Sequence, residues 1–247
     1  MPGAQTQGHL TDRIALVTGA TRGIGRAVAL RFADEGAQLI LTGRTTGALE
    51  EVDDEIQKRS GQPATLVPMD LTDFDAIDRL GAGIFERFGK LDILIGNAGM
   101  LGTLSPLGHT DPRVWDHVMA VNLTANWRLI RSMDPLLRQS DAGRAVFVTS
   151  TVGHTPRAYW SAYAVSKAAL EMAVKIYAEE TAETPIRVNL YNPGATRTSM
   201  RARAFPGEPP ESVKPPESVT EDFVRLSEPA CGLHGETVTA DPKPEGG

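Results

Sequence analysis

The chain contains one cysteine, no long apolar run and no apolar segment near its N-terminus. Cys231 cannot form a disulfide within the chain, which is typical of a protein of the reducing cytoplasm, and we expect it to pack rather than react. The lack of about 18 consecutive apolar residues argues against a membrane-spanning helix. Residues 1–11 are polar and lack the features of a secretory signal, so we expect a flexible N-terminus and a cytoplasmic protein.

Basic residues are also in the minority, with 25 Lys and Arg against 31 Asp and Glu. Nucleic acids and anionic membranes bind basic surfaces, so the net charge of -6 argues against both as the main partner. His109, His117 and His154 do not have the spacing of a metal site, and we expect no metal. A local basic pocket is still compatible with this charge.

Short apolar runs alternate with segments of helical periodicity along nearly the whole chain. This alternation predicts a single α/β domain with a Rossmann fold, a doubly wound parallel sheet of about seven strands flanked by helices. A Pro- and Gly-rich tail follows at residues 241–247. The predicted strands are residues 14–18, 38–42, 64–69, 91–95, 144–149, 186–191 and 235–240. The predicted helices include residues 46–59, 73–88, 112–137, 161–182 and 220–226.

A glycine-rich turn with Gly19, Gly23 and Gly25 follows the first predicted strand and leads into a helix. Strand, glycine turn and helix form the arrangement of a dinucleotide site, where a pyrophosphate approaches the backbone and the helix N-terminus. The spacing is Gly-x3-Gly-x-Gly, and a bare glycine turn also occurs in ordinary loops. The flanking strand and helix favour the dinucleotide interpretation.

The end of the second predicted strand discriminates between nicotinamide cofactors. An NAD site carries an acidic residue there, which binds the ribose 2′-hydroxyl. This chain has Gly43 and Arg44 instead, and Arg44 is able to pair with a 2′-phosphate, assisted by Arg22 in the glycine turn. We therefore expect NADP(H) rather than NAD(H). The alternative is that Arg44 is a solvated loop arginine.

Tyr163 and Lys167 lie four residues apart in the predicted helix 161–182, which places them on one face of that helix. A nearby cation lowers the pKa of a phenol from its usual ~10, and a tyrosine tuned in this way is able to exchange protons near neutral pH. Ser150 follows the fifth predicted strand, where an ordinary turn serine is the alternative. Asn122 lies inside the predicted helix 112–137, an unfavourable position for asparagine.

Ligands of such sheets gather at the carboxyl ends of the strands. Residues 196–217 follow one of these ends and combine apolar, basic and proline residues, so we expect a substrate-side lid. Predicted pocket walls, which imply a partly apolar small-molecule substrate, are Met100, Leu101, His154, Trp160, Met200 and Phe205.

With these motifs in order and at these spacings, the chain resembles the short-chain dehydrogenase/reductase (SDR) family from about residue 13 to 241. Residues 18–25 resemble its coenzyme turn, residues 97–99 its stabilising turn, and Ser150 precedes Tyr163 by the family's usual separation. Residues 97–102 and 196–206 look closest to a poorly characterised bacterial oxidoreductase subgroup. The cofactor-binding residues that the resemblance implies are Gly19, Thr21, Arg22, Gly23, Ile24, Gly25, Arg44, Asp70, Leu71, Asn97, Ala98, Gly99, Tyr163, Lys167, Pro193, Gly194, Thr196 and Thr198.

The same resemblance implies a catalytic tetrad of Asn122, Ser150, Tyr163 and Lys167 that interconverts a carbonyl and a secondary alcohol. Tyr163 would act as general acid/base, Ser150 would orient the carbonyl oxygen, and Lys167 would hold the ribose and lower the tyrosine pKa. Asn122 would anchor a water that leads protons to solvent. Family members commonly pair through the two long helices, so we expect a homodimer or homotetramer.

Three other functions remain open. One is a non-catalytic NADP(H)-sensing protein, although degenerate relatives typically lose the tyrosine or the lysine. Another is a 3-oxoacyl-carrier-protein reductase, which would need a basic docking patch; candidates are Arg128, Arg131, Arg201 and Arg203. The last is an epimerase or dehydratase that retains NAD. The absence of an acidic residue at position 43, which is Gly43, argues against it.

Overall fold

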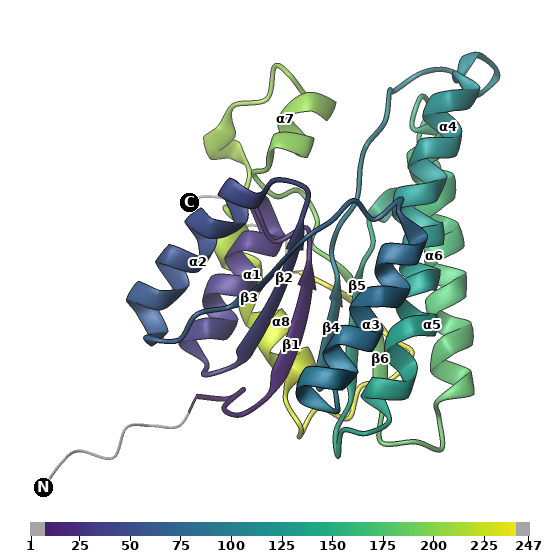
Figure 1. Ribbon diagram of the computed structural model, residues 1–247. Coiled ribbons are helices and arrows are strands. Elements are labelled where there is room, and N and C mark those ends of the chain that lie inside the picture. Colours follow the sequence, from purple (N-terminus) through teal and green to yellow (C-terminus); the bar gives the residue numbers. More distant parts are fainter. Residues whose placement is uncertain (1–7, 241–247) are drawn as a thin grey trace, which may run out of the picture.

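The computed structural model describes residues 8–240 (Figure 1). Most of the predicted flexible N-terminus, residues 1–7, and the predicted tail at 241–247 lie outside the described residues. Within residues 8–11, Leu10 is fully buried and its N–H donates a hydrogen bond to the Glu35 carbonyl, at 3.0 Å. This short segment is therefore held against the end of the first helix.

Seven parallel strands form one sheet in the order β3-β2-β1-β4-β5-β6-β7, which confirms the predicted fold class. The order reverses beside β1, whose two neighbours, β2 and β4, continue the chain in opposite directions across the sheet. A crevice opens at such a switch point, outside the carboxyl ends of the strands. The strands are β1 (Ile14–Thr18), β2 (Gln38–Gly43), β3 (Thr65–Pro68), β4 (Ile93–Gly96), β5 (Arg144–Val148), β6 (Arg187–Asn192) and β7 (Thr237–Thr239).

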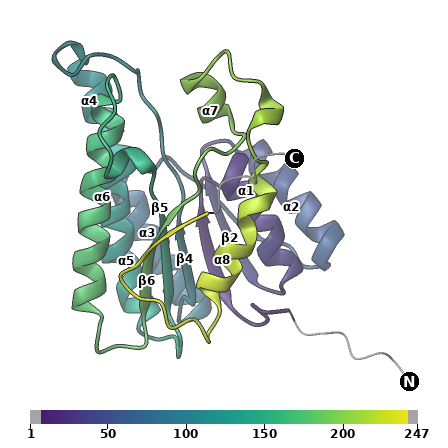
Figure 2. The same ribbon diagram turned by 180° about the vertical axis from the view of Figure 1, so that it is seen from behind.

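Helices cover both faces of the sheet (Figures 1 and 2). Successive strand residues point to opposite faces. In β1, Ala15 and Val17 therefore join the core under α1, α2 and α8, whereas Ile14 and Leu16 join the core under α3, α5 and α6. The helices are α1 (Gly23–Asp34), α2 (Thr46–Ser60), α3 (Phe74–Phe88), α4 (Pro112–Met119), α5 (Ala125–Leu137), α6 (Ser161–Glu180), α7 (Ser199–Ala204) and α8 (Thr220–Ser227).

Two elements differ from the sequence expectation. The predicted helix 112–137 is continuous, but residues Ala120–Thr124 between α4 and α5 adopt a wider π-helical turn that contains Asn122. The predicted lid 196–217 contains the short helix α7, in which the Thr198 hydroxyl accepts a hydrogen bond from the Arg201 N–H at 3.1 Å. A six-residue helix among prolines has too little periodicity to be recognised in a sequence. Within residues 8–240, no helix combines the length and apolar character needed to cross a membrane.

The buried Asp92, directly before β4, links β4 to β1 and β5 at the ends of the strands that lie opposite the crevice. Its carboxylate accepts hydrogen bonds from the Ile14 N–H at 2.9 Å and the Ser140 hydroxyl at 2.5 Å, and Lys90 Nζ lies 3.0 Å away. Its main-chain carbonyl accepts from the Arg144 N–H at 2.8 Å. Burial by itself would raise the pKa of Asp92, but the hydrogen bonds from Ser140 and Ile14 keep it below its usual value.

We expect Asp92→Ala to lower the free energy of unfolding by about 3 kcal/mol, because it leaves several buried donors without an acceptor. Chemical denaturation at neutral pH measures the loss, and Asp141→Ala, at an exposed neighbouring position, is the control. The contribution should decline only below about pH 4, since a carboxyl with a depressed pKa stabilises the fold above its unfolded pKa. A loss under about 1 kcal/mol would contradict this role.

Candidate active site

The ends of β1 and β4 are joined by side chains at the floor of the crevice. The Thr18 hydroxyl accepts from the Asn97 and Ala98 N–H groups at 3.0 and 3.1 Å, and Asn97 Nδ2 donates to the Thr18 carbonyl at 2.9 Å. Gly19 has a φ of 66°, and a Cβ at Gly25 would lie 2.3 Å from the Gly19 carbonyl oxygen. The turn therefore needs glycine both for its backbone conformation and for its close packing.

The first turn of α1 leaves backbone N–H groups for an anion. Arg22 occupies the N-cap position without a side-chain capping hydrogen bond, and the first turn contains no acidic residue. An uncapped helix N-terminus carries unpaired N–H groups and a partial positive charge. This end of the crevice therefore fits a phosphate group.

Two guanidinium groups reinforce that charge. Arg22 and Arg44 are both exposed and both line the crevice. Within residues 8–240, the side chain of neither arginine forms a hydrogen bond or ion pair. The Asp70 carboxylate accepts hydrogen bonds from the Thr72 N–H and hydroxyl at 2.9 and 2.8 Å. The Thr72 N–H is the main reason why the pKa of Asp70 lies below its usual value, and Arg44 lowers it further.

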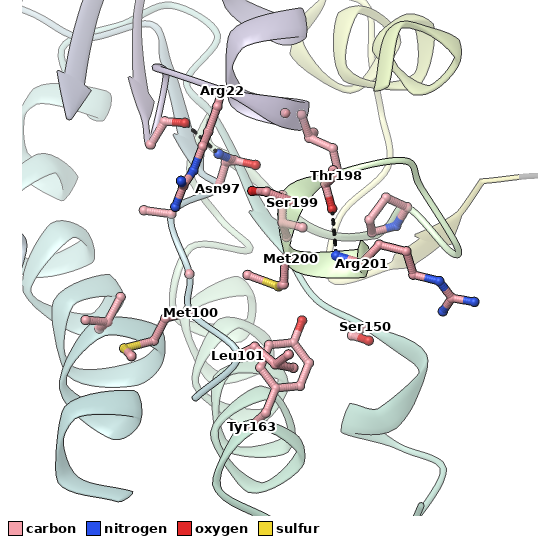
Figure 3. A pocket seen from close by; sticks show the side chains of 18 of the residues that line it. Arg22, Asn97, Met100, Leu101, Ser150, Tyr163, Thr198, Ser199, Met200 and Arg201 are labelled. Carbon is pink, nitrogen blue, oxygen red and sulfur yellow. Dashed lines mark hydrogen bonds between the residues drawn. The ribbon is translucent and has the colours of Figure 1, made fainter. Parts of the chain in front are cut away.

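Tyr163 on α6 and Ser150, two residues beyond the end of β5, both line the crevice (Figure 3). Burial raises the pKa of the Tyr163 phenol to about 12, and a hydrogen bond with Ser150 acts in the opposite direction. Removing a phenolate from water is costly, so the phenol holds its proton in the protein without ligands. The hydroxyl of Tyr163 is therefore a proton donor positioned beside a second hydroxyl.

The sequence predicts that Lys167 lowers the pKa of Tyr163, but in this structure the Tyr163 pKa is raised. The Lys167 side chain is 3% exposed and its Nζ donates to the Val148 carbonyl at 2.7 Å. Nζ lies 5.9 Å from the centroid of the Tyr163 ring. Burial lowers the pKa of Lys167 to about 8, although Glu171 opposes the shift. Desolvation therefore outweighs attraction, and the tyrosine pKa is raised rather than lowered in this state.

Asn122 is buried in the π-helical turn and clamps the loop after β4. Its Oδ1 accepts from the Met100 N–H at 2.8 Å, and its Nδ2 donates to the Met100 carbonyl at 2.9 Å and to the Ser166 hydroxyl at 3.0 Å. Both amide protons are thus used within the protein. The Asn122 carbonyl accepts from Asn126 Nδ2 at 2.8 Å. The side chain holds the loop beside α6, a role that explains its unfavourable helical position.

The other end of the crevice is apolar. Met100, Leu101, Trp160 and Met200 line it, with Met200 coming from α7 (Figure 3). The ring of Trp160 lies 5.8 Å from that of Tyr163 and 5.9 Å from that of Phe205, measured between centroids. The crevice has a volume of about 460 Å³, in the range of small-molecule sites. Its two ends thus differ in chemistry, one cationic and one apolar.

The crevice collects most of the residues singled out in the sequence. Gly25 and Asn122 do not line it, and neither do the expected wall residues His154 and Phe205. Sequence reasoning missed His117 and Val121, which lie one helical turn apart on α4 and its extension, and Ser199 on α7. The helical spacing of 117 and 121 was the available signal. The predicted site residues that do line the crevice are Gly19, Thr21, Arg22, Gly23, Ile24, Arg44, Asp70, Leu71, Asn97, Ala98, Gly99, Ser150, Tyr163, Lys167, Pro193, Gly194, Thr196 and Thr198.

Comparison with known proteins identifies the family. The family model for short chain dehydrogenases matches residues 13–209. The chain belongs to the short-chain dehydrogenase family. It is 42% identical over 215 residues to the uncharacterised oxidoreductase YciK of Escherichia coli K12, which covers 86% of this chain and 85% of that protein. The expected resemblance to a poorly characterised bacterial subgroup of this family is thus confirmed.

Solved structures of similar proteins agree with this assignment. A short chain dehydrogenase from Shigella flexneri 2a, complexed with NADP, has a TM-score of 0.92 at 39% identity, over 96% of this chain and 100% of that one. One from Escherichia coli CFT073, complexed with NADPH, has a TM-score of 0.92 at 40% identity, over 96% and 99%. The chain is therefore an oxidoreductase of the family that acts on alcohol and carbonyl groups.

Proposed function

We propose that this protein interconverts a carbonyl and a secondary alcohol with NADP(H), using Tyr163 as the general acid/base. The observation that carries the proposal is the buried phenol of Tyr163 beside the partly exposed Ser150, in one crevice with an uncapped helix N-terminus. Proton donor and anion site thus open onto the same space. Binding of NADP and NADPH by the similar Shigella and Escherichia proteins supports the choice of cofactor.

The residues present fit this dinucleotide along the length of the crevice. The uncapped first turn of α1 suits the pyrophosphate, and the unpaired guanidinium groups of Arg22 and Arg44 suit the 2′-phosphate. Asp70 and Leu71 are assigned to the adenine end. Residues assigned to the ribose and nicotinamide are Asn97, Ala98, Gly99, Tyr163, Lys167, Pro193, Gly194, Thr196 and Thr198.

In the reduction direction, the carbonyl carbon would receive a hydride from NADPH held in the crevice. Tyr163 donates its phenolic proton to the oxygen that becomes the alcohol, and Ser150 donates a hydrogen bond to the same oxygen. A positioned proton donor of this kind contributes roughly 10²–10⁴ in rate. Because burial holds the Tyr163 pKa at about 12, the proton stays on the phenol until negative charge develops beside it. Lys167 is the cation placed to stabilise the tyrosinate that results.

The substrate end of the crevice favours a partly apolar carbonyl compound. Met100, Leu101 and Met200 offer apolar surface there, and Trp160 covers it from the segment before α6. Residues 196–217, including α7, serve as the substrate-side lid, since Met200 is carried by that segment. A closed lid would exclude water during proton transfer. We propose that this reaction takes place in the cytoplasm, in keeping with the single cysteine.

We also propose that the protein is a homodimer or homotetramer. Met172 and Ile176 on α6 are 60% and 51% exposed, Val165 lies on the same helix face, and Trp127 on α5 is 50% exposed. Apolar side chains at this spacing form a stripe along the helix, and exposure of such a stripe to water is unfavourable. A second copy of the chain would remove that stripe from water.

Tyr163→Phe tests the mechanism. We expect kcat for NADPH-dependent reduction of probe carbonyls (camphorquinone and isatin) to fall by about 10³-fold, because no proton donor remains on the phenyl ring. The dissociation constant for NADPH should stay within about threefold. Tyr159→Phe, at an exposed tyrosine four residues away, is the matched control. Full activity of Tyr163→Phe would refute the mechanism, and NADPH binding without turnover by the wild type would favour a cofactor-sensing protein.

Arg44→Ala tests the cofactor preference. Loss of a charge-assisted pair with the 2′-phosphate, worth about 1.5–3 kcal/mol, should weaken NADPH binding by about 10- to 100-fold. NADH binding should be unchanged, because NADH has no 2′-phosphate. Fluorescence titration with both nucleotides measures this, and Lys58→Ala on the exposed side of α2 is the control. Equal losses for NADPH and NADH would show that Arg44 does not read the 2′-phosphate.

Ile176→Glu tests the oligomer. A charge placed in the apolar stripe should shift the protein toward monomer in sedimentation velocity, because a buried unpaired carboxylate is costly. Lys175→Glu, which changes charge at the neighbouring exposed position, is the control. A wild-type protein that sediments as a monomer at micromolar concentration would contradict the proposal, and an unchanged oligomer in Ile176→Glu would exclude this face.

A further inference from the structure

Glu171 is a buried carboxylate that lies one helical turn beyond Lys167 on α6 and has no part in the mechanism above. It is 7% exposed. Its Oε1 accepts a hydrogen bond from the Thr149 hydroxyl at 2.6 Å, and His154 Nδ1 lies 3.3 Å from the same oxygen. A carboxylate is rarely buried unless the protein uses its charge or its hydrogen bonds. Glu171 is able to act through its charge and through its hydrogen bonds.

The hydrogen bonds of α6 to the end of β5 come in a pair. Lys167 donates to the carbonyl of Val148, and Glu171 accepts from the hydroxyl of the next residue, Thr149. Ser150 follows directly in the chain. The two side chains of α6, one turn apart, thus hold the two residues that lead to Ser150. Since Tyr163 lies one turn before Lys167, the same helix face sets the separation of Ser150 and Tyr163.

The turn after Ser150 packs closely against Glu171 and Lys167 of α6. A Cβ at Gly153 would lie 2.7 Å from Glu171 Oε1 and 3.3 Å from the main-chain carbon of Lys167. That turn is also tied to the sheet, because Asn192 Nδ2 donates to the Thr151 hydroxyl at 3.0 Å. Ser150 is therefore held from α6 on one side and from β6 on the other.

We propose that Glu171 is a positioning residue for the reaction: its hydrogen bond to Thr149 fixes Ser150 relative to Tyr163, and its carboxylate lies one helical turn from Lys167. This inference rests on the proposed function of the site. It adds a fifth side chain, which touches none of the reacting atoms, to the predicted tetrad. Loss of the tie to Thr149 displaces Ser150, and loss of the charge makes Lys167 easier to deprotonate.

The surroundings of Lys167 leave Glu171 as its compensating charge. On α6 itself, the titratable neighbours of Lys167 are Tyr163 and Glu171. The loop after β5 presents His154, which faces Glu171 and is half exposed. Neutral groups also lie near Lys167 Nζ, namely the Val148 carbonyl and, beside Gly99, the Asn122 amide. His117, on the neighbouring helix α4, lines the same crevice. Burial lowers the Lys167 pKa to about 8, and the charge of Glu171 limits that decrease.

Three variants separate the two effects. Glu171→Gln removes the charge and keeps an acceptor for Thr149, so the alkaline limb of kcat/KM should move down by about one pH unit. Thr149→Val removes the tie and keeps the charge, so kcat should fall about tenfold or more with the alkaline limb unmoved. Glu171→Ala should show both changes. Glu179→Gln, an exposed position on the same helix, should show neither.

A readout without turnover accompanies the kinetics. The Lys167 ammonium is titrated by NMR in cofactor-free, 15N-lysine-labelled protein, and its signal is assigned with Lys167→Arg. The wild type should titrate near pH 8, and Glu171→Gln about one unit lower. This titration requires no substrate, so it decides on Glu171 even if no carbonyl compound is reduced and the proposed function fails.

An unchanged Lys167 titration in Glu171→Gln would overturn the proposal, whatever the activity. With an active wild type, kcat within about twofold of normal in both Thr149→Val and Glu171→Ala would also overturn it. A loss of kcat in Glu171→Ala that Glu171→Gln restores, together with a lowered Lys167 pKa in Glu171→Gln, is the result that supports it. The denaturation midpoint of each variant is compared with that of Glu179→Gln. This comparison shows whether a variant loses activity because it is less folded.

Discussion

The hydrogen bonds between Thr18 and Asn97 are the contact on which the rest of the site depends. They join the carboxyl ends of β1 and β4, the two strands between which the order of the sheet reverses. The chain leaves β1 through the glycine turn and leaves β4 toward the loop that Asn122 holds. Because both exits start from this one joint, the anion-binding end and the catalytic end of the crevice keep a constant relation.

Burial controls the electrostatics of the catalytic end. Tyr163 and Lys167 are both removed from water, which raises the pKa of the phenol and lowers that of the amine. Each shift favours the neutral form, so the pair resists the charge separation that proton transfer requires. In the proposed reaction, the substrate oxygen would become a stronger base than the Tyr163 phenolate. The phenol would therefore keep its proton until that oxygen develops negative charge.

Most of the fold follows from local pattern. The alternation of apolar runs with helical segments predicts every strand of the sheet to within a few residues, because the central strands are buried on both faces and therefore apolar. The short helix α7 and the π-helical turn at Asn122 were not predicted. Thr198 caps α7 locally, but prolines hide its periodicity, and the π-helical turn coincides with tertiary contacts from Asn122 to Met100 and Ser166.

Part of the candidate site also follows from local sequence pattern, and part depends on tertiary packing. Spacing alone put Tyr163 and Lys167 on one helix face and the glycines at a helix start, because i, i+4 geometry and strand-turn-helix order are properties of adjacent residues. Spacing could not predict that Lys167 donates a hydrogen bond to the Val148 carbonyl. Nor could it connect Glu171 with Thr149, 22 positions away. Such contacts depend on how α6 lies against β5, a matter of core packing that only the folded chain settles.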